Sequence, residues 1–413
     1  GSQVSGYAKK DSDYDVIVVL DKYRPKIKYK YINGDIDVSA LLVDSSSIVS
    51  DAKKGTFGEF VAGRFLNPYA ALEGEEFLKF VEVSYKTRII TEILGEIVST
   101  YGEFSHHLRI PIEFFLFEKL RKRAAIYPPT LYSYVNSYSG KNMKKNLRFS
   151  KLGFLDGASA LRSKGLVEIE DDVLRIDLSS SKASYLKRLS TMVRTTTRGM
   201  RQYATHGYAG RVGWSVLRKE SLSKLSRMKE TREPTKEIGH PKDLWNIDEG
   251  ELIVDSEDWF SKLIDHLGLT QMKNVSKKRV AIHHDVAKIY RFSDDSRSVN
   301  IAVKKFSELR SVKWVALNIW AIPSTRFRIS PIARLAKEYT YLRDLRKKGV
   351  NTPRILAIVL GERIMVTEFI EGVSIGETIA KNLKGESSFL EPVELYGETL
   401  GRVHAEGYRL GDA

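Results

Sequence analysis

Two aspartates near the start of the chain have the spacing of metal ligands. Asp13 and Asp15 flank Tyr14, and the strand-forming run DVIVVL begins at Asp15. Because successive side chains of a strand point to opposite faces, we expect the two carboxylates on one face and Tyr14 on the other. Magnesium prefers carboxylate oxygens, and two such ions about 3.5 to 4 Å apart can activate a hydroxyl and neutralise a leaving pyrophosphate. The spacing therefore predicts a site for Mg²⁺ or Mn²⁺ that serves phosphate chemistry.

A second β-branched run, IDVSALLV at residues 36–43, carries the candidates for a third metal ligand. Asp37 lies inside this run, whereas Asp35 follows the Asn33-Gly34 turn, where an aspartate often caps the turn. Asp37 is therefore preferred, and Asp35 stays open. We expect the two runs to be adjacent buried strands, closed into a small α/β unit by a helix from about Glu73 to Thr100.

The first fifteen residues read GSQVSGYAKKDSDYD and fit the pattern G-S-x-x-x-G-x-x-x-x-x-S-D-x-D at every fixed position. In this motif the chain resembles the DNA polymerase β-like nucleotidyltransferase superfamily. The resemblance implies that ATP or another nucleoside triphosphate is the substrate and that the three aspartates are catalytic and hold the metal. Backbone N–H groups at the start of the motif would reach the triphosphate. The nucleotide-binding residues implied in this way are Gly1, Ser2, Gly6 and Ser12.

A second set of residues suited to nucleotide chemistry lies in the C-terminal part of the chain. Lys304 belongs to the strand-like run VNIAVKKF, and Glu338 belongs to ISPIARLAKEYTYLRDLRKKG, an amphipathic helical run that stops at Gly349. VAIHHDVAKIYRF, PRILAIVL and RIMVTEFI are further strand candidates. With the later segments RIMVTEFIEG and LGRVHAEGYRLGD, residues 299–412 resemble the atypical protein-kinase-like family that includes the RIO and Bud-type kinases. The resemblance implies that Lys304 pairs the α and β phosphates of ATP while Glu338 holds that lysine.

The same resemblance implies further roles in this part of the chain. The backbones of Glu368 and Ile370 would bind adenine, Met365 would line its pocket, and Asp412 would be the catalytic-loop aspartate. The chain also departs from the family, because Leu410 replaces a histidine and AIHHDVAKIY lacks the glycines of a phosphate-covering loop. The family's next metal-binding residues would lie after residue 413. We therefore expect a kinase-like fold that binds ATP or docks a protein partner, without kinase activity from these residues alone.

The middle of the chain has features of nucleic-acid binding. A helix from Leu155 to Lys164, a stop at Gly165 and the strands LVEIE and VLRIDL resemble the end of a winged helix. From Lys182 to Lys229 there are 12 Lys or Arg against one acid, so the net charge is 12 − 1 = +11, with aromatic residues interleaved. Cations neutralise phosphates while aromatic rings stack on bases, so we expect RNA, such as tRNA or rRNA, as a partner. The candidate contacts are Lys187, Arg188, Arg194, Arg198, Arg201 and Arg211.

Composition sets the remaining limits. The chain has 413 residues, a net charge of +15, 42% hydrophobic residues and no cysteine, which excludes thiolate nucleophiles and cysteine-bound zinc. No apolar run reaches the roughly 20 residues that span a bilayer, so we expect a cytoplasmic protein with no membrane segment. The fold class is a multidomain α+β protein. Its expected parts are a nucleotidyltransferase domain at 1–110, a winged-helix-like domain at 111–180, a basic linker at 181–245 and a kinase-like domain at 246–413.

Three functions are compatible with these patterns. The leading hypothesis is transfer of a nucleoside monophosphate to a hydroxyl on RNA by the N-terminal site. A first alternative makes the C-terminal part a kinase for RNA or protein, with the N-terminal domain as an accessory. A second alternative is an RNA-binding scaffold without catalysis. The label that an acceptor receives, from the α-phosphate, the γ-phosphate or neither, distinguishes the three.

Overall fold

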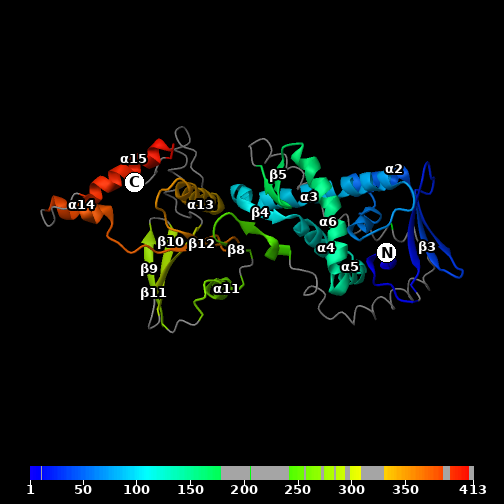
Figure 1. The fold of residues 1–413 in the computed structure, drawn as a ribbon, viewed down its shortest axis with the longest axis horizontal. Coiled ribbons are helices and arrows are strands. Elements are labelled where there is room, and N and C mark those ends of the chain that lie inside the picture. Colours follow the sequence, from blue (N-terminus) through cyan, green and yellow to red (C-terminus); the bar gives the residue numbers. More distant parts are fainter. Residues whose placement is uncertain are drawn as a thin grey trace. The chain divides into compact units, whose positions relative to one another are not determined.

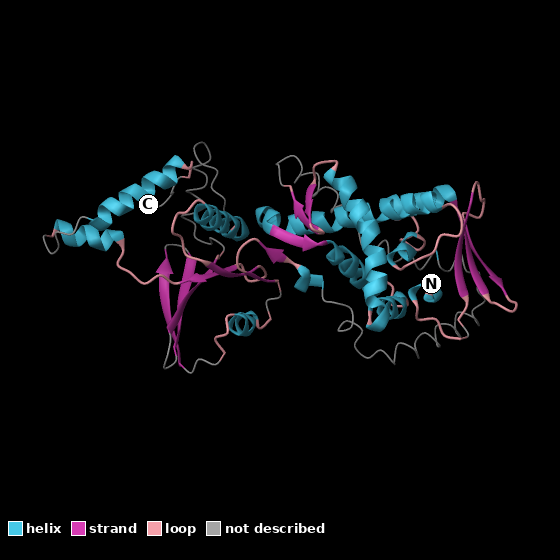
Figure 2. Cartoon of the chain, viewed as in Figure 1, coloured by secondary structure: helices cyan, strands magenta, loops and turns pink. Residues whose placement is uncertain are grey.

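The structure is a computed structural model in which the described residues form two compact units. The N-terminal unit is Gly1–Asn246 and the C-terminal unit is Ile247–Ala413. The described parts of the chain are residues 1–10, 12–177, 205, 241–254, 257–270, 274–282, 285–293, 298–307, 330–384 and 391–408. Both units mix helices with sheets (Figures 1 and 2), which confirms the coarse prediction of a multidomain α+β protein.

The N-terminal unit begins with a three-stranded sheet in which β1 and β3 are parallel neighbours and β2 is antiparallel to β3. The two predicted strands are therefore present and adjacent. β2 was not predicted, because its sequence IKYKYI lacks a continuous apolar run and all but two of its residues are exposed. The elements of this part are α1 (Ser2–Ser5), β1 (Tyr14–Leu20), β2 (Ile27–Ile32), β3 (Val38–Asp44) and α2 (Ser45–Lys54).

Helices follow the sheet and bury most of the apolar side chains of this unit. The helix expected from Glu73 to Thr100 is present as α3, which begins at Glu75 and ends at Tyr101. The predicted hairpin is also present, with Asp171 and Asp172 in the left-handed region that a tight turn requires. The elements are η1 (Ala62–Leu66), α3 (Glu75–Tyr101), η2 (Gly102–His107), β4 (Leu108–Pro111), α4 (Ile112–Ile126), α5 (Thr130–Tyr138), η3 (Gly140–Asn142), α6 (Met143–Arg162), β5 (Val167–Glu170), β6 (Val173–Ile176), η4 (Pro241–Leu244) and β7 (Asn246–Ile247).

Two points in this region differ from the expectation. The helix before the hairpin is α6, and it starts at Met143 rather than at Leu155. The hairpin is not alone, because β4 pairs with β6 in a sheet of order β5-β6-β4-β7. β4 has only four residues, Leu108–Pro111, and such a short run gives no clear periodicity.

Helices α3 and α6 approach each other closely at two glycines of α6. A Cβ atom at Gly153 would lie 2.5 Å from Oε1 of Glu82, and one at Gly157 would lie 2.9 Å from the backbone nitrogen of Thr87. These distances are too short for any side chain larger than hydrogen, so the four-residue spacing of the glycines permits the contact. α6 is thereby packed tightly along α3.

The C-terminal unit is built on a six-stranded sheet of order β8-β12-β13-β11-β10-β9. Its strands are antiparallel neighbours except for β8, which is parallel to β12. The predicted strands and the amphipathic helix α13 are confirmed, and Gly349 after this helix has φ 78°. The elements are β8 (Glu251–Ile253), α11 (Trp259–His266), β9 (Asn274–Ile282), β10 (Asp285–Ser293), β11 (Ser298–Lys305), α13 (Pro331–Lys347), β12 (Ile355–Val359), β13 (Ile364–Glu368), α14 (Ile375–Leu383) and α15 (Glu391–Ala405).

The two faces of this sheet have different roles. Ile301 and Val303 of β11 and Val366 of β13 belong to an apolar core that includes Leu263 of α11. Because side chains alternate along a strand, Lys304, which follows Val303, points to the opposite face.

Among the described residues, no helix has the length and apolar character to span a membrane.

Candidate functional site

The parallel pairing of β1 and β3 brings together the segments that carry the candidate metal ligands. Tyr14 is paired with Val38, and the Tyr14 N–H donates to the carbonyl oxygen of Asp37 at 2.8 Å. Continuing this register by one residue sets Asp13 beside Asp37. Side-chain alternation then places Asp13, Asp15 and Asp37 on one face of the sheet.

The alternative third ligand, Asp35, has no such placement. It lies in the bend after Gly34, outside the strand, whereas Asp37 immediately precedes the first residue of β3. Asp37 is thus not inside the strand, as the run IDVSALLV suggested, but it is still fixed by the backbone hydrogen bond from Tyr14. The geometry favours Asp37 over Asp35.

The donor set fits a hard divalent cation. Asp13, Asp15 and Asp37 are all exposed, so their carboxylates are open to water and to a phosphate-bound metal ion. In the described part of the chain, no three His, Asp or Glu side chains are already gathered closely enough to hold a metal ion. The extended register predicts a common face for the three residues, and their side chains do not form a closed cage.

The opening turn of the chain lies against Asp15. Gly1 precedes the single-turn helix α1, and a Cβ atom at Gly1 would lie 2.8 Å from Oδ2 of Asp15. Glycine is thus the residue that allows this backbone so close to the carboxylate. Ser2 is the first residue of α1, so the structure brings the start of the motif next to Asp15.

Ser12 closes the loop that leads back to β1. Its hydroxyl accepts a hydrogen bond from the Lys9 N–H at 2.8 Å, and its carbonyl accepts one from Nε2 of Gln3 at 3.2 Å. The Ser12 side chain therefore stabilises the loop itself, which is a structural role beside the nucleotide-binding role that the motif implies.

Gly6 ends α1 in the left-handed conformation, with φ 81°. Nδ2 of Asn142 donates to the Gly6 carbonyl at 2.9 Å, and Nδ2 of Asn146 donates to the Ser5 carbonyl at 2.9 Å. A side chain at Gly6 would meet Asn142 at 3.0 Å. Two asparagines, one at the end of η3 and one in α6, thus fix the position of the loop relative to the helices.

Arg64 is a cation near the aspartates that sequence reasoning missed. Burial lowers the pKa of its guanidinium, but Tyr29 and Asp15 outweigh this effect and leave the pKa raised. Its side chain donates to the Tyr29 hydroxyl, while its Nε atom has no hydrogen-bond partner among the described residues. The sequence AGRFL gives no signal for this role, because the contact depends on the tertiary fold.

A second missed feature is the exposed basic face of α6. Lys144, Lys145 and Arg148 are exposed, and they follow directly after Asn142, which contacts the Gly6 loop. The signal was present in the run MKKNLRFSK, where cations three and four residues apart share one helix face.

In the C-terminal unit the structure brings Lys304 and Glu338 together. Nζ of Lys304 lies 2.7 Å from Oε2 of Glu338, and the two side chains are 22% and 34% exposed. The lysine is on β11, the third of three successive antiparallel strands, and the glutamate is on the next described helix, α13. Met365 on β13 is paired directly with Lys304 and is buried.

Of the residues expected to bind adenine, Glu368 is in the same strand as Met365 and Ile370 follows the end of that strand. Glu368 is the last residue of β13, and its N–H donates to the Arg354 carbonyl at 2.9 Å. Ile370, two residues later, is 60% exposed. An exposed apolar residue at this point is compatible with contact to a ligand.

Several predicted residues lie outside the described residues. They are Asp412 and the six cations Lys187, Arg188, Arg194, Arg198, Arg201 and Arg211.

Comparison of the chain with protein-family models, curated proteins and solved structures finds no match. The interpretation of both sites therefore depends on the motifs and contacts of this chain.

Proposed function

We propose that the chain is a Mg²⁺-dependent nucleotidyltransferase that moves a nucleoside monophosphate from ATP or another nucleoside triphosphate to a hydroxyl on RNA. The observation that carries the proposal is the parallel register of β1 and β3, which starts at the pair Tyr14–Val38. Extended by one residue, this register would set Asp13 beside Asp37, on the same face as Asp15. The glycine-serine turn packed against Asp15 supports it.

In the proposed reaction the acceptor hydroxyl oxygen attacks the α-phosphorus. The bond from this phosphorus to the bridging oxygen breaks, pyrophosphate leaves, and the hydroxyl passes its proton to water. Asp13 and Asp15 would hold divalent ions, which supply charge neutralisation for the triphosphate. Asp37 would orient the acceptor hydroxyl from the neighbouring strand, and the buried guanidinium of Arg64 provides positive potential behind Asp15.

RNA as the acceptor is supported by the distribution of positive charge. The cation-rich segment from Lys182 to Lys229 provides one basic region, and the exposed face of α6 provides another. Lys144, Lys145 and Arg148 can contact phosphates beside the Gly6 loop, where a strand would approach the aspartates.

The test is incubation of the full chain with Mg²⁺, total RNA and total protein, using nucleoside triphosphates labelled at either the α or the γ position. Transfer of α-label to RNA supports the proposed reaction. Transfer of γ-label instead selects a kinase, and strong salt-dependent RNA binding with no transfer of either label selects a scaffold.

The choice of Asp37 over Asp35 as the third carboxylate can be tested by comparing two variants. Asp37→Asn is expected to slow α-label transfer by about a hundredfold, because it removes a charge that orients the acceptor and assists the metal. Asp35→Asn, two residues earlier in the exposed bend, is expected to retain nearly full activity. The rates of the two variants at saturating Mg²⁺ decide between the residues, and equal losses would contradict the choice of Asp37.

A second candidate function, ATP binding by the C-terminal unit, is favoured by the Lys304–Glu338 ion pair. In protein kinases a lysine on the third strand contacts the ATP phosphates, and a glutamate on the following helix holds it in place. The order of three antiparallel strands, a helix and two more strands agrees with that arrangement. We propose that this unit binds ATP, or docks a protein partner on the same surface.

Lys304 and its neighbour Lys305 allow this second function to be tested. Lys304→Ala is expected to weaken ATP binding by about tenfold or more, because a charge-assisted contact to phosphate is lost. Lys305→Ala is the control, because Lys305 pairs with Glu362 at 2.6 Å and is 52% exposed. Binding is measured by calorimetry on the full chain carrying Asp13→Asn and Asp15→Asn, which removes the proposed nucleotide site at the aspartates and leaves the rest of the chain the same in both variants. Equal affinities in the two variants would contradict the assignment.

A further inference from the structure

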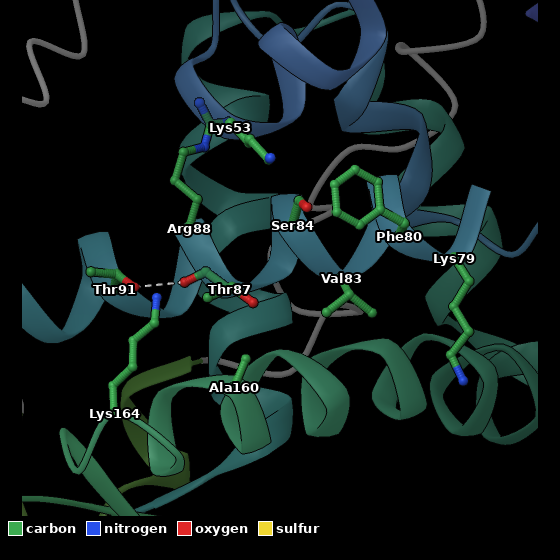
Figure 3. Close-up of a pocket in the computed structure, with 10 residues that line it drawn as sticks. All are labelled: Lys53, Lys79, Phe80, Val83, Ser84, Thr87, Arg88, Thr91, Ala160 and Lys164. Atoms are coloured by element: carbon green, nitrogen blue, oxygen red, sulfur yellow. Dashed lines mark hydrogen bonds between the residues drawn. The ribbon is translucent and has the colours of Figure 1, made fainter. Parts of the chain in front are cut away.

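A pocket in the N-terminal unit lies between α2, α3 and the end of α6, and no part of the proposed transfer reaction uses it. Its volume is about 640 Å³, within the range of small-molecule sites. Four cations line it: Lys53 from α2, Lys79 and Arg88 from α3, and Lys164 just after α6 (Figure 3). No carboxylate is among the lining residues, so the pocket is strongly positive.

Arg88 is the most constrained of these cations. Its side chain is 10% exposed, and its Nη2 atom donates to Oε1 of Glu59 at 2.8 Å. Its Nε and Nη1 atoms have no hydrogen-bond partner among the described residues, since Glu92 is 3.7 Å from Nε. Buried donors without partners are rare in folded proteins and cost free energy. An acceptor supplied by a ligand would satisfy them.

The carboxylate that pairs with Arg88 is shared with other buried cations. Glu59 also pairs with Lys119 at 2.8 Å and with Arg123 at 2.9 Å. The buried Asp51 interacts electrostatically with both Glu59 and Arg88. The charge of Arg88 is thus balanced within the cluster, and what Arg88 offers to a ligand is its unsatisfied N–H donors.

The other cations of the pocket are also available to a ligand. Lys53 and Lys164 are exposed and have no ion pair within the part of the chain that the structure describes. Lys79 is paired with Asp156 at 3.4 Å, but both side chains are largely exposed and the pair is weak. Lys53 and Lys164 thus contribute positive charge to the pocket without an ion-pair partner among the described residues.

The pocket also has an aromatic wall. Phe80 is 48% exposed, and Nζ of Lys53 lies 4.9 Å from the centre of its ring. Exposed aromatic rings next to phosphate-binding cations are the usual means of holding a base. Val83 and Ala160 add apolar surface beside it.

We propose that this pocket binds a nucleotide unit, with its phosphate on Lys53, Arg88 and Lys164 and its base against Phe80. The unit is either a free mononucleotide or one nucleotide of an RNA strand, since both present the same phosphate and base. The proposal is independent of the transfer reaction at the aspartates.

The test measures binding of AMP, and of a ten-nucleotide single-stranded RNA without terminal phosphates, to the full chain in EDTA. The pocket variant is Lys53→Glu with Lys164→Glu, both exposed positions. The control is Lys54→Glu with Arg162→Glu, which makes the same charge change on the same two segments, outside the pocket. The pocket variant is expected to bind about tenfold more weakly or worse, and the control to bind nearly as the wild type.

The ligand whose binding weakens in the pocket variant shows whether the pocket takes a free nucleotide or a nucleotide of an RNA strand. Weaker AMP binding indicates a free nucleotide, and weaker binding of RNA alone indicates the phosphodiester backbone. Phe80→Leu should then weaken AMP or RNA but leave binding of inorganic phosphate unchanged, because only the base contact is lost. The proposal is overturned if neither ligand binds, or if the pocket variant and the control behave alike.

Discussion

Replacing Asp13 and Asp15 together by asparagine is expected to reduce Mg²⁺-dependent transfer of α-label by about a thousandfold or more. Asparagine has nearly the same shape as aspartate, so the pairing of β1 with β3 should be preserved while two negative charges are removed. Without those charges the site loses its affinity for divalent ions. The prediction is tested by measuring the rate of label transfer to RNA for the wild type and the double variant over a range of Mg²⁺ concentrations.

A matched control lies at the other end of the same strand. Asp21 is exposed and follows the last residue of β1, so Asp21→Asn removes a charge without approaching the proposed site. Its rate should equal that of the wild type. The proposed mechanism is wrong if the double variant transfers α-label as fast as the Asp21 control. A thermal unfolding curve for each variant shows that the comparison is made between folded proteins.

The second large effect concerns stability and the buried glutamate Glu59. This carboxylate is 3% exposed. It accepts hydrogen bonds from Lys119 at 2.8 Å, Arg123 at 2.9 Å and the Tyr85 hydroxyl at 3.1 Å, as well as from Arg88. Glu59→Gln leaves these buried cations without their shared negative charge. We expect a loss of about 3 to 5 kcal/mol in the free energy of unfolding of this unit.

Titration of Lys119 explains part of this cost. Burial lowers the pKa of the Lys119 ammonium, and the nearby Glu59 carboxylate opposes that effect. When the carboxylate is removed, the charged form of the lysine is stabilised less. The buried ammonium must then either lose its proton or stay charged with weaker electrostatic stabilisation. Either outcome lowers the stability of the fold.

The control for Glu59 is Glu96 on α3, whose carboxylate is 41% exposed and pairs with Lys122. Glu96→Gln is expected to cost less than about 1 kcal/mol, because exposed ion pairs contribute little. Urea unfolding followed by circular dichroism compares the two variants. Similar small losses for both would show that the Glu59 cluster is not essential to the fold.

The local features of the chain could largely be predicted from its sequence. The β-branched run after Asp15 predicted β1, and the second run predicted the neighbouring strand β3. Asp37 was expected inside that strand and instead lies one residue before it. Similarly, the spacing of apolar residues predicted α13 and its end near Gly349. These predictions succeed because each depends on residues close together in the chain.

The tertiary features could not be predicted in this way. Glu59 contacts Lys119 and Arg123, which are at least 60 residues away along the chain. In the sequence FEKLRKRAA those cations indicate a solvated helix face, although Lys119 and Arg123 are buried. The proximity of Arg64 to Asp15 and the pocket lined by α2, α3 and α6 also depend on contacts between distant segments. The roles of the proposed site residues stay predictions.

Helix α6 sets a length scale for any RNA that the N-terminal unit binds. Its 20 residues, at about 1.5 Å each, make a rod of roughly 30 Å. Asn142, before its first residue, holds the Gly6 loop, and Lys164, beyond its last residue, lines the basic pocket. Since stacked nucleotides advance about 3.4 Å each, a strand that reaches from one end of the helix to the other contains roughly nine nucleotides. Shorter stacked strands can occupy only one end, so binding that involves both ends requires a minimum length of RNA.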